Sequence, residues 1–241
     1  MTDPRLNALP ERTRTHLERL QRELVALLGD KLQAIVAFGS LARGGFDPER
    51  SDIDLVIVLH DDSRQSLRAV GATLELARNA ARIEAILLRS DELASAADVF
   101  PLLYDDIRGR NIVLYGSDPF AALEILDEHR RLRIEQELRE AQIRLRRAVV
   151  ESAVAPKGFA GAIERKVKQI RGPLHALLHL RGVEVGDELA AVLGGCAKRF
   201  AIDIAALSRV RESAEAAHDA LVQLLDAAVR DVDTTSRQEP R

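Results

Sequence analysis

The pattern of apolar and polar residues divides the chain into a first part of mixed periodicity and a second part of helical periodicity. In the first part, the continuous apolar and β-branched run Ile53–Leu59 predicts a buried strand. Residues 31–38, 82–88 and 111–115 predict three more strands. Residues 17–28 and 66–82 carry apolar residues three and four apart, as amphipathic helices do, and Thr15 with Glu18 matches a capping box near the first of these helices.

The second part begins after the turn-forming residues 116–119, and three apolar stripes at helical spacing follow it. They are Ile134, Leu138, Ala141, Leu145 and Val149, then Ile163, Val167, Ile170, Leu174 and Leu177, then Ala214, Ala217, Leu221, Leu224 and Ala228. A shorter helix is expected over 187–196, which makes a bundle of four or five helices.

The predicted fold class is therefore α+β. A small mixed β-sheet domain with flanking helices is expected over residues 1–117, followed by an all-α helical bundle domain over residues 118–231. The polar residues 232–241 are expected to form a disordered tail.

The turn between the first two predicted strands has the composition of a phosphate-binding loop. Gly39 can adopt backbone angles closed to other residues and lets a phosphate approach, and Ser40 adds a hydroxyl donor. Arg43 adds charged donors for the same phosphates. The loop ends at Asp52 and Asp54, which project from one face if residue 53 begins a strand. Two carboxylates this close favour a cation between them, and Mg²⁺ prefers such oxygen ligands.

A third carboxylate, Glu84, lies within the apolar run predicted as a later buried strand. A lone acid in a buried strand is costly unless it is paired or binds a metal. With Asp52 and Asp54 it would hold two metal ions that clamp the oxygens of an in-line displacement. The competing interpretation is that such a glutamate marks the edge of the sheet. Each motif alone is commonly structural, and only their joint order favours a site.

These residues resemble the nucleotidyltransferase superfamily typified by DNA polymerase β, and most closely its small bacterial branch. That branch includes aminoglycoside adenylyltransferases and minimal nucleotidyltransferases that work with helical partners. The resemblance covers residues 31–90 and implies that Gly39 and Ser40 contact a triphosphate, that Asp52 and Asp54 bind Mg²⁺, and that Glu84 is a metal ligand or deprotonates the acceptor. We also assign Arg43 and Ser51 to the nucleotide-binding set.

Composition narrows the choice of partners. The formal net charge of −3 counts against a duplex nucleic acid, and an aromatic content of 3% leaves few platforms for stacking single-stranded bases. The single cysteine, Cys196, excludes an internal disulfide and is expected in the core. With neither a signal peptide nor a membrane-spanning run in the sequence, we expect a cytoplasmic protein.

The predicted function is Mg²⁺-dependent transfer of a nucleoside monophosphate, AMP from ATP by analogy, to a hydroxylated acceptor such as an aminoglycoside, with release of pyrophosphate. The alternatives are modification of a protein and a non-catalytic, antitoxin-like nucleotide-binding protein. The helical bundle would supply the acceptor pocket or a homodimer interface. Arginines and glutamates alternate over residues 130–147, which indicates a solvated face of ion pairs or, alternatively, an acidic pocket for a cationic acceptor.

Overall fold

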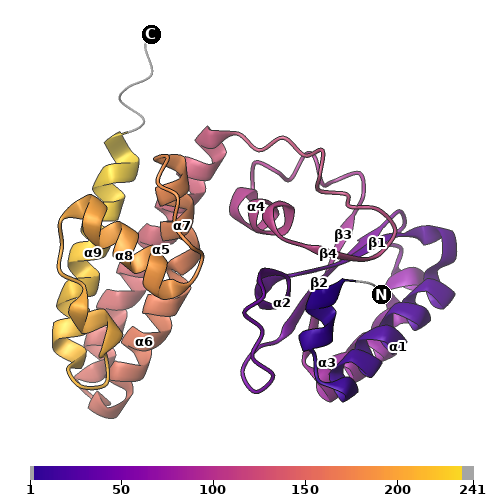
Figure 1. The fold of residues 1–241 in the computed structure, drawn as a ribbon, viewed down its shortest axis with the longest axis horizontal. Coiled ribbons are helices and arrows are strands. Elements are labelled where there is room, and N and C mark those ends of the chain that lie inside the picture. The colour runs from indigo at the N-terminus through magenta and orange to yellow at the C-terminus, as the bar shows by residue number, and fades with distance from the viewer. Residues whose placement is uncertain (1–2, 235–241) are drawn as a thin grey trace, which may run out of the picture. The chain divides into compact units, whose positions relative to one another are not determined.

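The computed structural model describes residues 3–234 and divides the chain into two compact units between Ile125 and Leu126 (Figure 1). The first unit holds a four-stranded mixed sheet with flanking helices, and the described part of the second unit is helical. The predicted α+β class is confirmed. The domain limits at residues 117 and 231 stay predictions. Among the described residues, no helix has both the length and the apolar character that a membrane span requires.

The sheet of the first unit has the strand order β3-β2-β1-β4. Its strands are β1 (Leu32–Phe38), β2 (Ile53–Leu59), β3 (Ile83–Arg89) and β4 (Ile112–Tyr115). Strand β1 pairs antiparallel with β2 and with β4, whereas β2 and β3 are parallel. A parallel neighbour needs a long crossover, and helix α3 provides it.

The helices of the first unit cover both faces of the sheet (Figure 1). They are α1 (Glu11–Leu28), α2 (Gly39–Arg43), α3 (Arg64–Ala81) and α4 (Pro101–Gly109), with short 3-10 turns at Pro4–Ala8 and Gly29–Lys31. Helices α1 and α3 bury one face of the sheet, which includes Leu55 and Ile57. Tyr104 and Ile107 of α4 pack on the opposite face.

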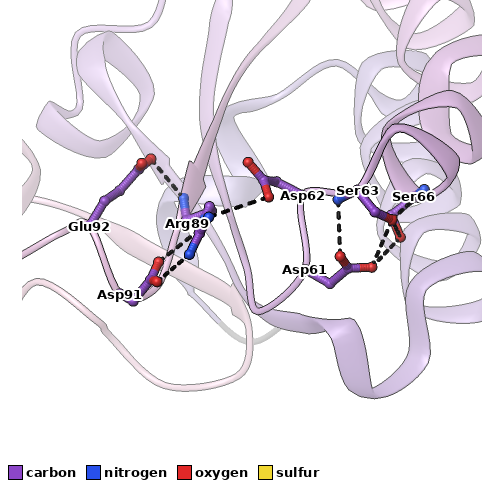
Figure 2. Close-up of polar contacts among 7 residues, drawn as sticks. All are labelled: Asp61, Asp62, Ser63, Ser66, Arg89, Asp91 and Glu92. Carbon is purple, nitrogen blue, oxygen red and sulfur yellow. Dashed lines mark hydrogen bonds and ion pairs between the residues drawn. The ribbon is translucent and has the colours of Figure 1, made fainter.

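Polar contacts fix the ends of β2 and β3 (Figure 2). Ser63 caps α3 by accepting a hydrogen bond from the Ser66 N–H, and the Ser66 hydroxyl donates to Asp61 at 2.7 Å. The Ser66 hydroxyl, the Lys31 ammonium and the N–H and hydroxyl of Ser63 all donate to Asp61 and hold its pKa well below the usual value. Arg89 at the end of β3 pairs with Asp91. The far end of the sheet from the motif acids is thus organised by charge pairs.

One sequence-based expectation about α1 is wrong. The helix begins at Glu11, one turn before Thr15, and its N-cap is Pro10, which makes no side-chain capping bond. The Thr15 hydroxyl instead donates to the Glu11 carbonyl within the helix at 2.9 Å. A Thr-x-x-Glu pattern one turn into a helix cannot be told from a capping box by sequence alone.

The second unit is built from five helices in the part of the chain that the structure describes. They are α5 (Asp127–Ser152), α6 (Phe159–Gln169), α7 (Arg171–Leu180), α8 (Leu189–Phe200) and α9 (Ala214–Thr234), with 3-10 turns at Pro156–Gly158 and Ala205–Ser208. The stripe predicted over 163–177 divides between α6 and α7 at Ile170. Cys196 is fully buried as expected, but Val149 is exposed.

The last helix reaches further than the sequence indicated. Residues 232–234, expected in the disordered tail, belong to α9, and residues 235–241 lie outside the described residues. Val232 is fully buried in the helical unit, which explains why the helix continues. The preceding residue, Asp231, accepts hydrogen bonds from Arg181 at 2.9 Å and Arg199 at 2.7 Å, so it links the ends of α7 and α8 to α9.

Replacing Asp231 with asparagine is predicted to destabilise the helical unit by about 1–3 kcal/mol at pH 7. Burial alone would raise the pKa of Asp231, but the hydrogen bonds from Arg199 and Arg181 lower it below the usual value. The carboxylate therefore contributes stability above pH ~4, and this contribution is lost as the pH falls through the lowered pKa. Urea unfolding from pH 7 to pH 3 measures it. Asp219→Asn, on an exposed part of the same helix, is the control; equal effects of the two variants would contradict the prediction.

Candidate functional site

Strand pairing places Asp54 at the centre of the motif residues. Asp54 on β2 lies opposite Phe38 of β1 and opposite Glu84 of β3. Residues paired across strands lie on the same face of a sheet, so Asp54 and Glu84 share the face that α4 covers further along the strands. The residue that follows Phe38 is Gly39, where β1 ends and α2 begins. The register therefore brings the glycine turn, the second aspartate and the glutamate to one end of β2.

The approach of Gly39 to Asp54 is too close for a side chain. Gly39 has φ +69°, a conformation that side chains disfavour, and a Cβ atom built there would lie 2.2 Å from Asp54 Oδ2. The missing side chain thus lets the turn lie directly against the carboxylate. Glycine is required at this position for two separate reasons, conformation and space.

The electrostatic surroundings of Asp54 favour a bound cation. Burial raises the pKa of Asp54, and the negative charge of Asp52 raises it further. Arg43 opposes this rise, while Asp106 and Glu84 add to it. A half-buried carboxylate among three other acids is costly to ionise, and positive charge supplied at this place would lower that cost.

Asp52 is held by an arginine from the end of α3. Arg82 donates from Nε to Asp52 Oδ1 at 2.8 Å, and its other nitrogens donate to the carbonyls of Glu49 at 2.8 Å and Arg50 at 2.7 Å. Its own carbonyl accepts from the Ile53 N–H at 3.0 Å. Arg82 also has φ +52°, which is uncommon for a residue with a side chain. This one arginine therefore fixes the end of the motif loop against the entry to β2.

Glu84 is not in the environment expected from the sequence. Strand β3 is an edge strand, and Glu84 is exposed and forms an ion pair with Arg78 at 3.0 Å. The expectation that Glu84 is buried in a central strand is therefore wrong. The competing interpretation, that it marks the edge of the sheet, is correct. What supports a role in the site is its pairing with Asp54 across the strands.

The acids do not form a ready metal site as they stand. In the described residues, no group of three or more histidine, cysteine, aspartate or glutamate side chains is arranged to hold a metal ion. Asp52 and Glu84 each pair instead with an arginine of α3 or its C-cap. The chemistry of the set nevertheless fits Mg²⁺, because all three donors are carboxylates.

Arg43, predicted to contact phosphate, is held by a residue that sequence reasoning missed. Its Nη1 donates to both carboxylate oxygens of Asp106 at 2.8 Å, from α2 to α4. Asp106 also acts electrostatically on Asp54. Its signal in the sequence is faint: Tyr104 and Ile107 mark the buried side of a short helix, but nothing local to Asp106 indicates its partner.

The two predicted serines lie in different surroundings. Ser40 follows Gly39 in α2, and its carbonyl accepts from the Gly45 N–H at 3.0 Å. Ser51 closes the motif loop, since its hydroxyl oxygen accepts from the Asp47 N–H at 3.0 Å and its N–H donates to the Asp47 carbonyl at 2.8 Å. Contacts of either serine with a nucleotide stay predictions.

Comparison with known proteins agrees with the position of the motif. A family model described as a nucleotidyltransferase domain matches residues 17–143, which include the whole sheet and the candidate site. A search of curated proteins finds no match.

The solved structures that are similar to the chain include the following two. One is the spectinomycin adenyltransferase AAD(9) from Enterococcus faecialis with ATP and spectinomycin, at 13% identity, 89% coverage of this chain, 98% coverage of that chain and a TM-score of 0.49. The other is a toxin-antitoxin with AMP-PNP, at 22% identity, 57% coverage of this chain, 98% coverage of that chain and a TM-score of 0.31.

Gly39→Ala is predicted to destabilise the first unit by about 1–3 kcal/mol and to weaken any nucleotide binding at the motif. The matched control is Gly44→Ala, because Gly44 also has a positive φ, +83°, but a Cβ there would meet nothing within 4 Å. Both variants place alanine in an unfavourable backbone conformation, and only Gly39→Ala also displaces Asp54. Thermal unfolding and nucleotide titration compare them. Equal losses in the two variants would show that the contact with Asp54 is unimportant.

Proposed function

The chain belongs to the nucleotidyltransferase domain family, and from this premise we propose that it transfers AMP from ATP to a hydroxyl group of a small-molecule acceptor. The observation that carries the proposal is the close approach of Gly39 to Asp54, within the register that joins Asp54 to Glu84. The glycine turn leaves room for a triphosphate. The neighbouring carboxylates repel one another and suit the cations that accompany the triphosphate.

In the proposed reaction, the acceptor oxygen attacks the α-phosphorus of ATP and forms a new phosphorus–oxygen bond. The bond from the α-phosphorus to the oxygen that bridges the α- and β-phosphates breaks, and pyrophosphate leaves with the electron pair. Glu84 is proposed to take the proton of the acceptor hydroxyl, because its carboxylate is exposed to solvent and lies on the same face as Asp54.

Asp52, Asp54 and Glu84 are the residues that would hold Mg²⁺. When bound, Mg²⁺ would neutralise charge on the phosphates and lower the proton affinity of the acceptor. To bind Mg²⁺, Asp52 must first release Arg82, and Glu84 must release Arg78. The two arginines then become available as cations near the N-terminal ends of β2 and β3.

Gly39 and Ser40 are proposed to contact the triphosphate, with Arg43 and Ser51 as further nucleotide-binding residues. Asp106 is proposed to position Arg43, since it holds one guanidinium nitrogen with both of its carboxylate oxygens. A guanidinium fixed in this way loses less conformational freedom when it binds a phosphate.

We propose as acceptor an aminoglycoside or another small hydroxylated molecule, because the reaction needs a hydroxyl group that attacks ATP.

One observation favours a second candidate function, nucleotide binding without turnover. Two of the three acids are neutralised by arginines, as a protein that binds nucleotide without catalytic metals would tolerate. An assay of transfer, rather than of binding, separates the two candidates.

The test uses ATP labelled at the α-phosphate or at the γ-phosphate, Mg²⁺ and a panel of aminoglycosides, other polyhydroxylated small molecules and proteins. The α-label is expected on the acceptor and the γ-label in pyrophosphate. Asp54→Asn is expected to lower transfer by about 10²–10⁴-fold. The control is Asp91→Asn, at the opposite end of the sheet.

Three results would contradict the proposal. Transfer of the γ-label to an acceptor would indicate a phosphotransferase. Undiminished transfer by Asp54→Asn would place the active site elsewhere. Binding of ATP with no transfer to any member of the panel would favour the non-catalytic candidate.

A further inference from the structure

The helical unit contains a basic cavity that the proposed reaction does not use. It has a volume of about 350 Å³ and lies between the C-terminal half of α5 and helix α6. Its polar wall consists of Arg144, Arg147, Glu151, Arg165, Lys166 and Gln169. Its volume admits a small molecule, and the cavity is open to solvent, since Arg144, Arg147 and Glu151 are exposed.

Positive charge is in excess on this wall. Four cationic side chains face one carboxylate among the described residues that line the cavity, and that carboxylate, Glu151, is already bonded to Arg147 at 2.6 Å. Glu140, from the preceding turns of α5, accepts from Arg144 at 3.3 Å. The surplus is local, because the whole chain has a formal net charge of −3. Where α5 lines this cavity, its charged side chains are therefore mainly basic.

Burial and the surplus of positive charge both lower the pKa of Lys166. Burial lowers the pKa of its ammonium group, and the charges of Arg144 and Arg165 lower it further, while Glu140 opposes them. Its Nζ donates to the neutral Gln169 Oε1 at 2.6 Å. A half-buried lysine that faces two arginines is stabilised by any anion that enters the cavity.

We propose that this cavity, the basic pocket of α5 and α6, binds the phosphate chain of a small polyphosphate ligand. Arginine forks and a lysine are the side chains that recognise phosphate oxygens. None of the described residues that line the pocket is aromatic, so the pocket offers no platform for a base. The recognised chemistry is thus the phosphate chain itself, whether it is inorganic or the tail of a nucleotide.

The test is calorimetry of the full chain with inorganic tripolyphosphate, at fixed ionic strength and in EDTA, so that Mg²⁺-dependent binding at the motif of the first unit is suppressed. Arg165→Gln and Lys166→Gln are each expected to weaken binding about tenfold, as loss of a charge-assisted hydrogen bond predicts. The matched control is Arg146→Gln. Like the two test variants it removes one positive charge, but from an exposed residue of α5 that does not line the pocket. Asp54→Asn is expected to bind as the unmodified protein does.

A second arm replaces tripolyphosphate with ATP under the same conditions. Weakening of ATP binding by Lys166→Gln would identify a nucleotide tail as a source of the phosphate chain, and binding of tripolyphosphate alone would identify an inorganic one. Both results support the pocket.

An independent measurement is protection of Lys166 from acetylation by tripolyphosphate, read by mass spectrometry, which does not depend on a variant. Absence of both binding and protection would overturn the proposal. Binding that Arg146→Gln weakens as much as Lys166→Gln, or that Asp54→Asn abolishes, would also overturn it.

Discussion

The candidate site depends on the register of strand β2 between its two neighbours. Asp54 lies opposite Phe38 on one side and Glu84 on the other, and Gly39 follows Phe38 directly. Because side chains alternate along a strand, a shift of one residue would move Asp54 to the face that α1 and α3 bury. That shift is costly because it would bury the Asp54 carboxylate among apolar side chains such as Leu55 and Ile57.

Helix α3 gives the site both its geometry and its charge balance. As the crossover between two parallel strands, it brings β3 beside β2 and so places Glu84 opposite Asp54. Its last turn and its C-cap carry Arg78 and Arg82, which pair with Glu84 and Asp52. Carboxylates that would otherwise repel one another are thereby neutralised. The same ion pairs oppose metal binding, so the proposed activity requires that a nucleotide and its metal together outcompete two arginines.

Much of the first unit could be predicted because its signals are local. The strand predicted over Ile53–Leu59 has the same bounds as β2 in the structure. The turn and loop from Gly39 to Asp54 could be recognised by the glycine, the serine and the paired acids. The edge position of β3 could not be decided in this way, although Glu84 left it open as the competing interpretation. Its residues 85–88 are as apolar as those of a central strand, and sheet order is decided by contacts between distant segments.

The same limit explains the residues that sequence reasoning missed. Asp106 acts through Arg43, which lies 63 positions earlier in the chain, and Arg82 acts through backbone carbonyls of the motif loop. An exposed arginine or aspartate in a helix has many available partners, and only the fold selects one. In the second unit, the helical stripes predicted the core well, but their period continued through the break at Ile170 between α6 and α7.

Calorimetry with a non-hydrolysable ATP analogue tests whether the carboxylates around Asp54 bind a nucleotide through a metal. We expect Mg²⁺ to tighten binding at least about tenfold and Asp54→Asn to remove this increment while the fold persists. Equal affinity with Mg²⁺ and with EDTA, or an Mg²⁺ effect that survives in Asp54→Asn, would contradict it.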